Sequence, residues 1–147
     1  MNKVYRHKPL AADEYLGHVA FDGKVYETRF GPDKFVGHVE LDSGKIYGPG
    51  INNYLGQVIL DSGKVYRHKP LAADEYLGQM GDDGKLYRHR IGPDEYIGRI
   101  EGTNAYALGG AAFMLLAWPM VEAELKEQQE MKEGKETGEG GETGGNK

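Results

Sequence analysis

The chain repeats a unit of about 20 residues five times. The unit reads Gly-Lys-Val/Ile/Leu-Tyr, continues through a loop that carries Asp or Asn, and ends in aromatic-aliphatic-Gly-x-aliphatic followed by a turn of Asp, Ser and Gly. The repeated tyrosines and glycines are Tyr5, Tyr26, Tyr47, Tyr66 and Tyr87, and Gly17, Gly37, Gly56, Gly78 and Gly98. A unit this small cannot bury its own apolar face, so the units must pack against one another.

A longer duplication is nested in this pattern. The segment Lys3–Gly17 recurs unchanged as Lys64–Gly78, and the following units keep the same offset. The units therefore run A, B, C, A, B. A second C unit would begin after Glu101, where the sequence resembles it only faintly, so we interpret that segment as a lost or overwritten sixth unit.

Within each unit the apolar residues alternate with a period of two, which is typical of strands. We expect one face of residues 15–21 to line the core, with equivalent residues in the other units. That face consists of Tyr15, Gly17, Val19 and Phe21. Turns such as Asp22-Gly23 supply the positive φ that tight hairpins need, so each Gly-x-aliphatic strand should turn directly into the next Lys-aliphatic-Tyr strand. The unit is thus predicted to be a β-hairpin.

Both ends of the repeat region are half-units. The chain begins with the second strand of a hairpin, Lys3–Arg6, and its last repeat ends with a first strand, Tyr96–Glu101. Neither strand can complete its hydrogen bonds alone, so we predict that the two pair and remove both open edges. The predicted fold is mainly β, with five β-hairpin repeats around a pseudo-fivefold axis and a C-terminal apolar helix.

Two repeated residue types have a structural and a functional interpretation. The strand glycines make room for a neighbouring side chain or a bend, or else they form a backbone surface that a ligand approaches. The Asp or Asn of each loop caps its own turn, or else the five form a metal-binding ring. We favour the structural interpretation of both residue types. For the loop residues the reason is that Asn52 would interrupt a ring of carboxylates.

The five histidines lack the spacing of a metal site, and no nucleophile-base pair accompanies them. If the chain has a binding or catalytic histidine, His18 and His38 are the best-placed candidates. Both follow a repeat glycine, which makes them adjacent equivalents on one face of the sheet. We predict no catalytic residue, no metal site and no cofactor.

Composition and charge narrow the remaining classes of protein and partner. The chain has 147 residues and no cysteine, which excludes disulfides and cysteine-bound zinc. Its net charge is −5, and residues 122–147 hold eight Glu and four Lys, so the repeats are almost neutral. A near-neutral fold gives no electrostatic reason to expect nucleic acid as a partner. The sequence does not open on a secretory leader, so we expect a cytoplasmic protein, with membrane association as the alternative.

A second type of sequence follows the repeats of residues 1–104. Residues 105–121 carry no charge, and helix-favouring residues continue to about residue 133. Pro119 should kink this helix or mark its restart. An apolar helix is enclosed either by protein or by lipid, so residues 105–121 either pack on the repeats as core or form a membrane anchor. Residues 134–147 are Gly- and Glu-rich and are predicted to be disordered.

The fivefold recurrence of Gly-Lys-Val-Tyr and aromatic-aliphatic-Gly-x-aliphatic, followed by Gly109–Leu116, resembles the small bacterial repeat proteins described as five-fold β-flowers. The resemblance covers residues 3–117. It implies a ring of hairpins with a C-terminal apolar segment. The family has no assigned activity, so the resemblance implies no functional residue.

Three classes of function are consistent with these features. The first, which we favour, is a non-catalytic structural or protein-interaction module that binds a protein partner or assembles as a homo-oligomer. The second is a scaffold anchored to a membrane through residues 105–121. The third is an enzyme or small-ligand binder with a pocket at the axis of the repeats.

Overall fold

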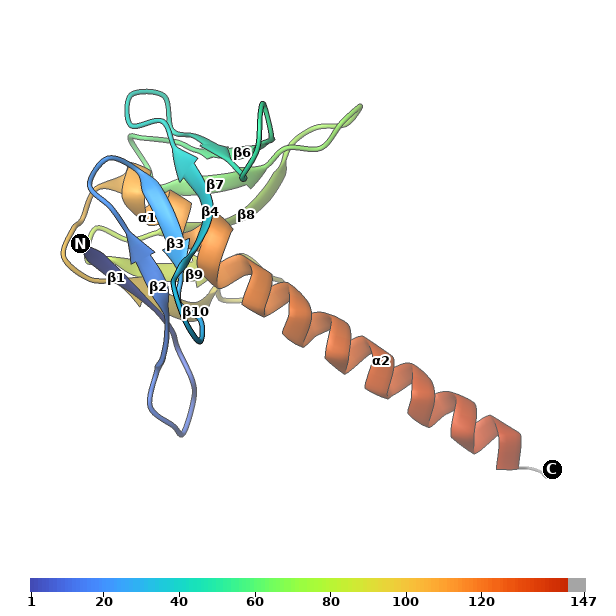
Figure 1. Cartoon of the computed structure of the whole chain (residues 1–147). Coiled ribbons are helices and arrows are strands. Elements are labelled where there is room, and N and C mark those ends of the chain that lie inside the picture. Colours follow the sequence, from blue (N-terminus) through green and yellow to red (C-terminus); the bar gives the residue numbers. More distant parts are fainter. Residues whose placement is uncertain (143–147) are drawn as a thin grey trace.

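The computed structural model describes the backbone of residues 1–142 and the side chains of residues 1–133. Ten antiparallel strands form one closed barrel, and a C-terminal helix leaves it as a long rod (Figure 1). The strands are β1 (Asn2–Arg6), β2 (Glu14–Val19), β3 (Lys24–Glu27), β4 (Lys34–Val39), β5 (Lys45–Tyr47), β6 (Tyr54–Val58), β7 (Lys64–Arg67), β8 (Glu75–Met80), β9 (Lys85–Arg88) and β10 (Glu95–Ile100).

The two terminal strands of the repeats close the barrel, as predicted. Strand β1 pairs with β2 on one side and with β10 on the other, where Val4 lies opposite Ile100 and Arg6 opposite Gly98. The remaining strands pair in chain order around the ring. Because every strand then has two neighbours, the barrel has no free edge at which another strand could add.

Two kinds of connection alternate around the barrel. Short turns join β2 to β3, β4 to β5, β6 to β7 and β8 to β9, and each contains a glycine with positive φ. At Gly23 (φ +98°) an added Cβ would also lie 2.4 Å from the Val39 carbonyl oxygen, so glycine is required there. Longer loops join the other pairs at the opposite end. They span residues 7–13, 28–33, 48–53, 68–74 and 89–94.

The predicted core face is wrong for the aromatic residues, because every long-loop hairpin contains a β-bulge. Tyr5 lies opposite Tyr15 and Val4 opposite Gly17, so Leu16 is an extra residue in β2. The bulge shifts the alternation by one residue. Tyr15 therefore lies on the outer face against Tyr5, while Leu16 is buried inside.

The remaining part of that face behaves differently at its two ends. Val19 and Gly17 are buried, as the alternation predicts. Phe21, however, lies in the turn beyond the end of β2 and is 63% exposed. Period-two alternation cannot place residues that follow the last paired residue of a strand.

A helix fills the centre of the barrel. It consists of α1 (Tyr106–Ala112), the π-helical segment η1 (Phe113–Ala117) and α2 (Trp118–Glu142). Residues 107–117 are all buried. At Gly109 an added Cβ would lie 1.7 Å from Met80 Sδ, and at Gly110 it would lie 2.3 Å from Val58 Cβ. The missing side chains therefore let the helix fit inside the wall.

The strand glycines Gly37, Gly56 and Gly78 make room for the same helix, and all five repeat glycines make room for a carbonyl oxygen of the neighbouring strand. An added Cβ at Gly56 would lie 2.1 Å from the Tyr66 carbonyl oxygen and 2.8 Å from Met114 Cε. At Gly37 it would lie 3.0 Å from Leu115 Cδ1. These contacts confirm the steric interpretation of the repeated glycine.

The helix changes from α-helical to π-helical geometry just before Pro119. The five residues of η1 are π-helical, and the Trp118 N–H donates to the Phe113 carbonyl before α2 continues. A proline donates no hydrogen bond and crowds the carbonyl four residues earlier, which here is that of Leu115. The wider turn accommodates the proline, so the helix restarts at Trp118.

By length and composition the helix Tyr106–Glu133 could cross a membrane, although 67% of its most apolar 18-residue window is buried inside the protein. The backbone of α2 is helical to Glu142, whereas the sequence predicts a disordered tail from residue 134. Residues 143–147 lie outside the described part of the chain, and disorder of the tail stays a prediction.

Candidate functional site

Aromatic side chains form a girdle around the outside of the barrel. Each repeat contributes one cross-strand pair, with ring centroids 5.3–5.8 Å apart. The pairs are Tyr5–Tyr15, Tyr26–Phe35, Tyr47–Tyr54, Tyr66–Tyr76 and Tyr87–Tyr96. Such pairs stabilise neighbouring strands. The repeated tyrosine is therefore a structural residue of the outer face.

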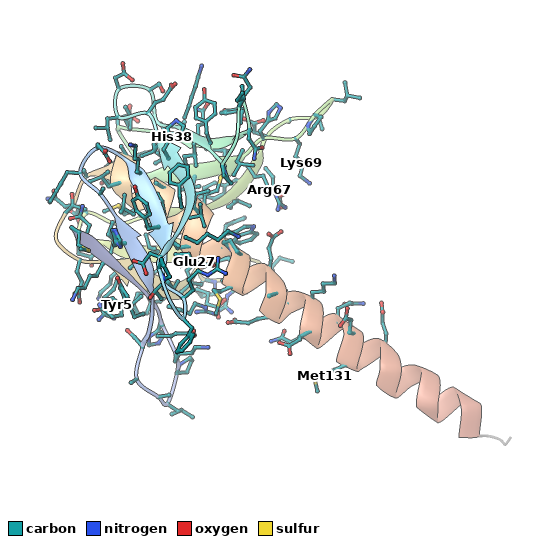
Figure 2. All side chains as sticks on the ribbon, viewed as in Figure 1. Tyr5, Glu27, His38, Arg67, Lys69 and Met131 are labelled. Atoms are coloured by element: carbon teal, nitrogen blue, oxygen red, sulfur yellow. The ribbon has the colours of Figure 1, made fainter. Side chains whose placement is uncertain are left out.

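The two candidate histidines belong to this girdle. His18 stacks on Tyr26 and His38 stacks on Tyr47, each with ring centroids 5.1 Å apart. They lie on the same outer face, as predicted, but β3 separates their strands. Figure 2 labels His38 on the barrel. The structure thus gives each histidine its own tyrosine and does not bring the two together.

His18 has the more polar surroundings of the two. Its Nδ1 lies 3.6 Å from Asp33 Oδ2, beyond hydrogen-bond distance. The two residues line a hollow of about 430 Å³ together with Tyr5, Tyr15 and Lys3. Burial raises the pKa of the Tyr15 hydroxyl, and the Asp33 carboxylate adds to this effect. The hollow holds neither a serine nor a threonine that His18 could activate as a nucleophile.

The other histidines brace the long loops. His7, His68 and His89 lie 3.2–3.5 Å from the loop carboxylates of Asp13, Asp74 and Asp94. Among residues 1–133, no three His, Cys, Asp or Glu side chains converge as metal ligands.

Asp13 also caps its loop. The Lys8 N–H donates to Asp13 Oδ1 at 3.2 Å, which lowers the pKa of this carboxyl. Arg99 makes an ion pair with the same carboxylate. In the first loop, Asp13 thus holds the hairpin loop in place, as the capping interpretation expects.

Each long loop carries at its tip one large apolar side chain that projects into solvent. These five residues, which we call the crown, are between 93% and 108% exposed. The crown consists of Leu10, Phe30, Ile51, Leu71 and Ile91. In Figure 1 the loop after β1 and the loop before β8 reach out on different sides of α2. Solvent-exposed apolar residues at equivalent places in all five repeats mark a potential contact surface.

Two crown residues also have unfavourable backbone conformations. Leu10 has φ +65° and Leu71 has φ +63°. A left-handed leucine costs roughly 1 kcal/mol relative to a glycine. Neither side chain gains any burial in return. The other long loops also contain a residue with positive φ, such as Gly31 (φ +93°) and Gly92 (φ +87°), so the turn itself requires this conformation.

The helix leaves the barrel through the ring of long loops. Arg6 at the end of β1 pairs with Glu124, and Arg67 at the end of β7 pairs with Glu122. Figure 2 shows Arg67 and Lys69 on the side from which α2 leaves and Met131 far out along it. Two hollows of about 720 and 480 Å³ flank the base of α2, and Arg67, Trp118 and Glu122 line both.

Comparison with known protein families, with curated proteins and with solved structures finds no match for this chain.

Sequence reasoning missed the crown and the hollows for different reasons. The crown has a sequence signal, because each loop holds one apolar residue next to Pro or Gly, as in Pro9-Leu10 and Phe30-Gly31. Turn residues around a lone apolar residue predict an exposed tip. The hollows depend on how one helix sits inside a fivefold ring, and no local pattern records that position.

Proposed function

We propose that this protein is a non-catalytic interaction module that binds a protein partner through the crown. The observation that carries the proposal is the complete exposure of one large apolar side chain at each of the five loop tips. Apolar tips on a rigid barrel lose little conformational freedom on binding, which favours association. The barrel itself supplies the rigidity, because it has no free edge and its centre is filled.

A membrane-anchored scaffold is the second candidate, and the geometry favours it less. Residues 107–117 lie inside the barrel, so an anchor would have to leave the core that it fills. Docking of the crown on a flat bilayer is also obstructed, because α2 projects between the loops and carries charges such as Glu122 and Lys126. A protein partner can leave space for this helix.

Binding of a small ligand at the axis of the repeats is the third candidate. The side chains of α1 and η1 occupy that axis, with Ala111, Phe113 and Ala117 completely buried. A nucleic-acid partner is expected least, because crown-flanking cations such as Lys8 and Lys69 are paired with Glu14 and Glu75.

We also infer that the chain belongs with the five-fold β-flowers, supported by its five closed hairpins and its apolar helix.

The test replaces all five crown residues with serine and compares the proteins captured by the variant and by the wild type from cells that express it. We expect the variant to lose its partner and to keep its melting temperature, because exposed side chains contribute little to stability. The matched control replaces Phe21, Leu41 and Leu60, which are exposed at the opposite end of the barrel. Equal recovery of partners by the crown variant and the wild type would refute the proposal.

A further control addresses the histidines. Replacing His18 and His38 with glutamine, the residue at Gln57 and Gln79, should leave folding and partner binding nearly unchanged. If this double variant lost a measurable activity while its thermal stability stayed intact, the non-catalytic assignment would be wrong.

A further inference from the structure

The smaller of the two hollows beside α2 arises because one helix cannot seal a fivefold ring evenly. The bulge of each repeat places one aliphatic residue at the helix exit. Leu16, Leu77 and Ile97 are at most 7% exposed, whereas Val36 and Leu55 are only partly buried. The missing cover on the side of β4 and β6 leaves a hollow of about 480 Å³.

The walls of this hollow are mainly apolar. Strands and helix contribute aliphatic, thioether and indole groups, from Val36, Leu55, Met114, Leu115, Trp118 and Pro119. The volume lies within the range of small-molecule sites in proteins, which are concave and mostly apolar. The hollow is therefore large enough for a small organic molecule.

The charged groups at the mouth already have partners, whereas the buried Trp118 Nε1–H has none among residues 1–133. Arg67 donates to Glu122 at 2.7 Å and to Glu75 at 2.6 Å, and these contacts raise the pKa of its guanidinium. His68 lies 3.4 Å from Asp74. A charged ligand would have to compete with these pairs, whereas a neutral ligand would not.

The contacts of Trp118 favour an aliphatic ligand over an aromatic one. Phe113 lies nearly parallel to the indole at 6.1 Å, and the Arg67 guanidinium lies over the ring at 5.8 Å. Because these groups already stack on the indole, the aliphatic side chains of the hollow are the main surface that remains for a ligand.

We propose that the hollow lined by Val36, Leu55 and Trp118 is a binding site for a small neutral molecule with an aliphatic chain. This site lies off the axis of the repeats and contains no crown residue, although His68 and Pro70 of the loop that carries Leu71 line its mouth. The two proposals can therefore fail independently.

The only tryptophan of the chain lines the site, so its fluorescence reports occupancy directly. The probes are 1-octanol, octanoate and octylammonium, each titrated below its aggregation concentration. We expect 1-octanol to shift the Trp118 emission to shorter wavelength in a saturable way, because it displaces water from the indole. Both ions should bind more weakly. Absence of a saturable shift, or tighter binding of either ion, would overturn the proposal.

Variants separate this site from nonspecific binding. Leu55→Phe should fill the hollow and weaken 1-octanol binding by about tenfold or more, which corresponds to losing roughly 1.4 kcal/mol. Leu10→Phe adds the same bulk at an exposed loop tip and should bind like the wild type. If Leu55→Phe does not fold, Val36→Phe tests the opposite wall. Wild-type affinity in a folded hollow-filling variant refutes the site, whereas the crown variant with five serines should retain 1-octanol binding.

Discussion

Two arginines show how identical sequence meets different surroundings in this protein. Arg6 and Arg67 occupy the same place in the duplicated segments Lys3–Gly17 and Lys64–Gly78. Only 9% of the Arg6 side chain is exposed, and it donates to the carbonyls of His7 and Ile97 and to Glu124. The Arg67 side chain is 33% exposed. The helix covers Arg6 more than Arg67, which breaks the fivefold symmetry.

This difference makes the duplicated pair a matched experiment. Arg6→Met should lower the free energy of unfolding by about 2 kcal/mol, because it removes a largely buried charged donor to two carbonyls and to Glu124, while the Ile97 carbonyl keeps the His7 N–H. Arg67→Met should cost less than about 1 kcal/mol, because its ion pairs are more exposed to solvent. Urea denaturation of both variants measures the difference. Equal losses would show that the two copies have equivalent surroundings.

At the scale of elements, the helix through the barrel contributes most to the core. Leu116 is 4% exposed, whereas Leu10 at a loop tip is completely exposed. Leu116 lines a small hollow beside Glu14 and Glu27, so a new carboxylate there would lie near two like charges. The two leucines therefore compare a buried site with a fully exposed one.

Leu116→Asp should destabilise the protein by more than about 3 kcal/mol, because it buries a carboxylate close to those of Glu14 and Glu27. The same change at Leu10 should be neutral or slightly stabilising, since aspartate tolerates a positive φ better than leucine does. Thermal melting followed by circular dichroism compares the two. A folded Leu116→Asp barrel that no longer cosediments with membranes would instead support the anchor interpretation.

The sequence was sufficient to predict the elements that depend on local chemistry. Turns such as Asp22-Gly23 fix the hairpins, and the half-units at both ends require closure. The bulge at Leu16 was not predictable from alternation, since its neighbours Tyr15 and Gly17 fit a regular strand equally well. The apolar segment was expected to pack on the repeats, but its place in the centre depends on contacts such as that of Gly109 with Met80.

At the scale of the whole molecule, the N-terminal strand holds the ring together. Strand β1 forms ladders with both β2 and β10, and its Val4 side chain is completely buried. Removing it would expose two strand edges and part of the core. No other strand is free to replace it, because the remaining strands already pair in chain order.

Deletion of residues 1–5 should therefore prevent stable folding or lower the melting temperature severely. The control deletion removes residues 143–147, which belong to the tail predicted to be disordered, and should have little effect. Dispersion of amide signals in NMR spectra distinguishes folded from unfolded protein in both cases. A truncated protein as well folded as the wild type would contradict the role of closure.

The helix inside the ring also limits how this protein can evolve. Open repeat arrays gain and lose units freely, because each unit contacts only its neighbours. Here the circumference of the barrel must match the width of the helix inside it. A sixth hairpin would widen the barrel, and a helix rich in alanine and glycine would then leave voids against the barrel wall. The A, B, C, A, B order accordingly stops after Glu101, where the chain turns into the barrel instead of adding a unit. In this fold the copy number is a property of the core.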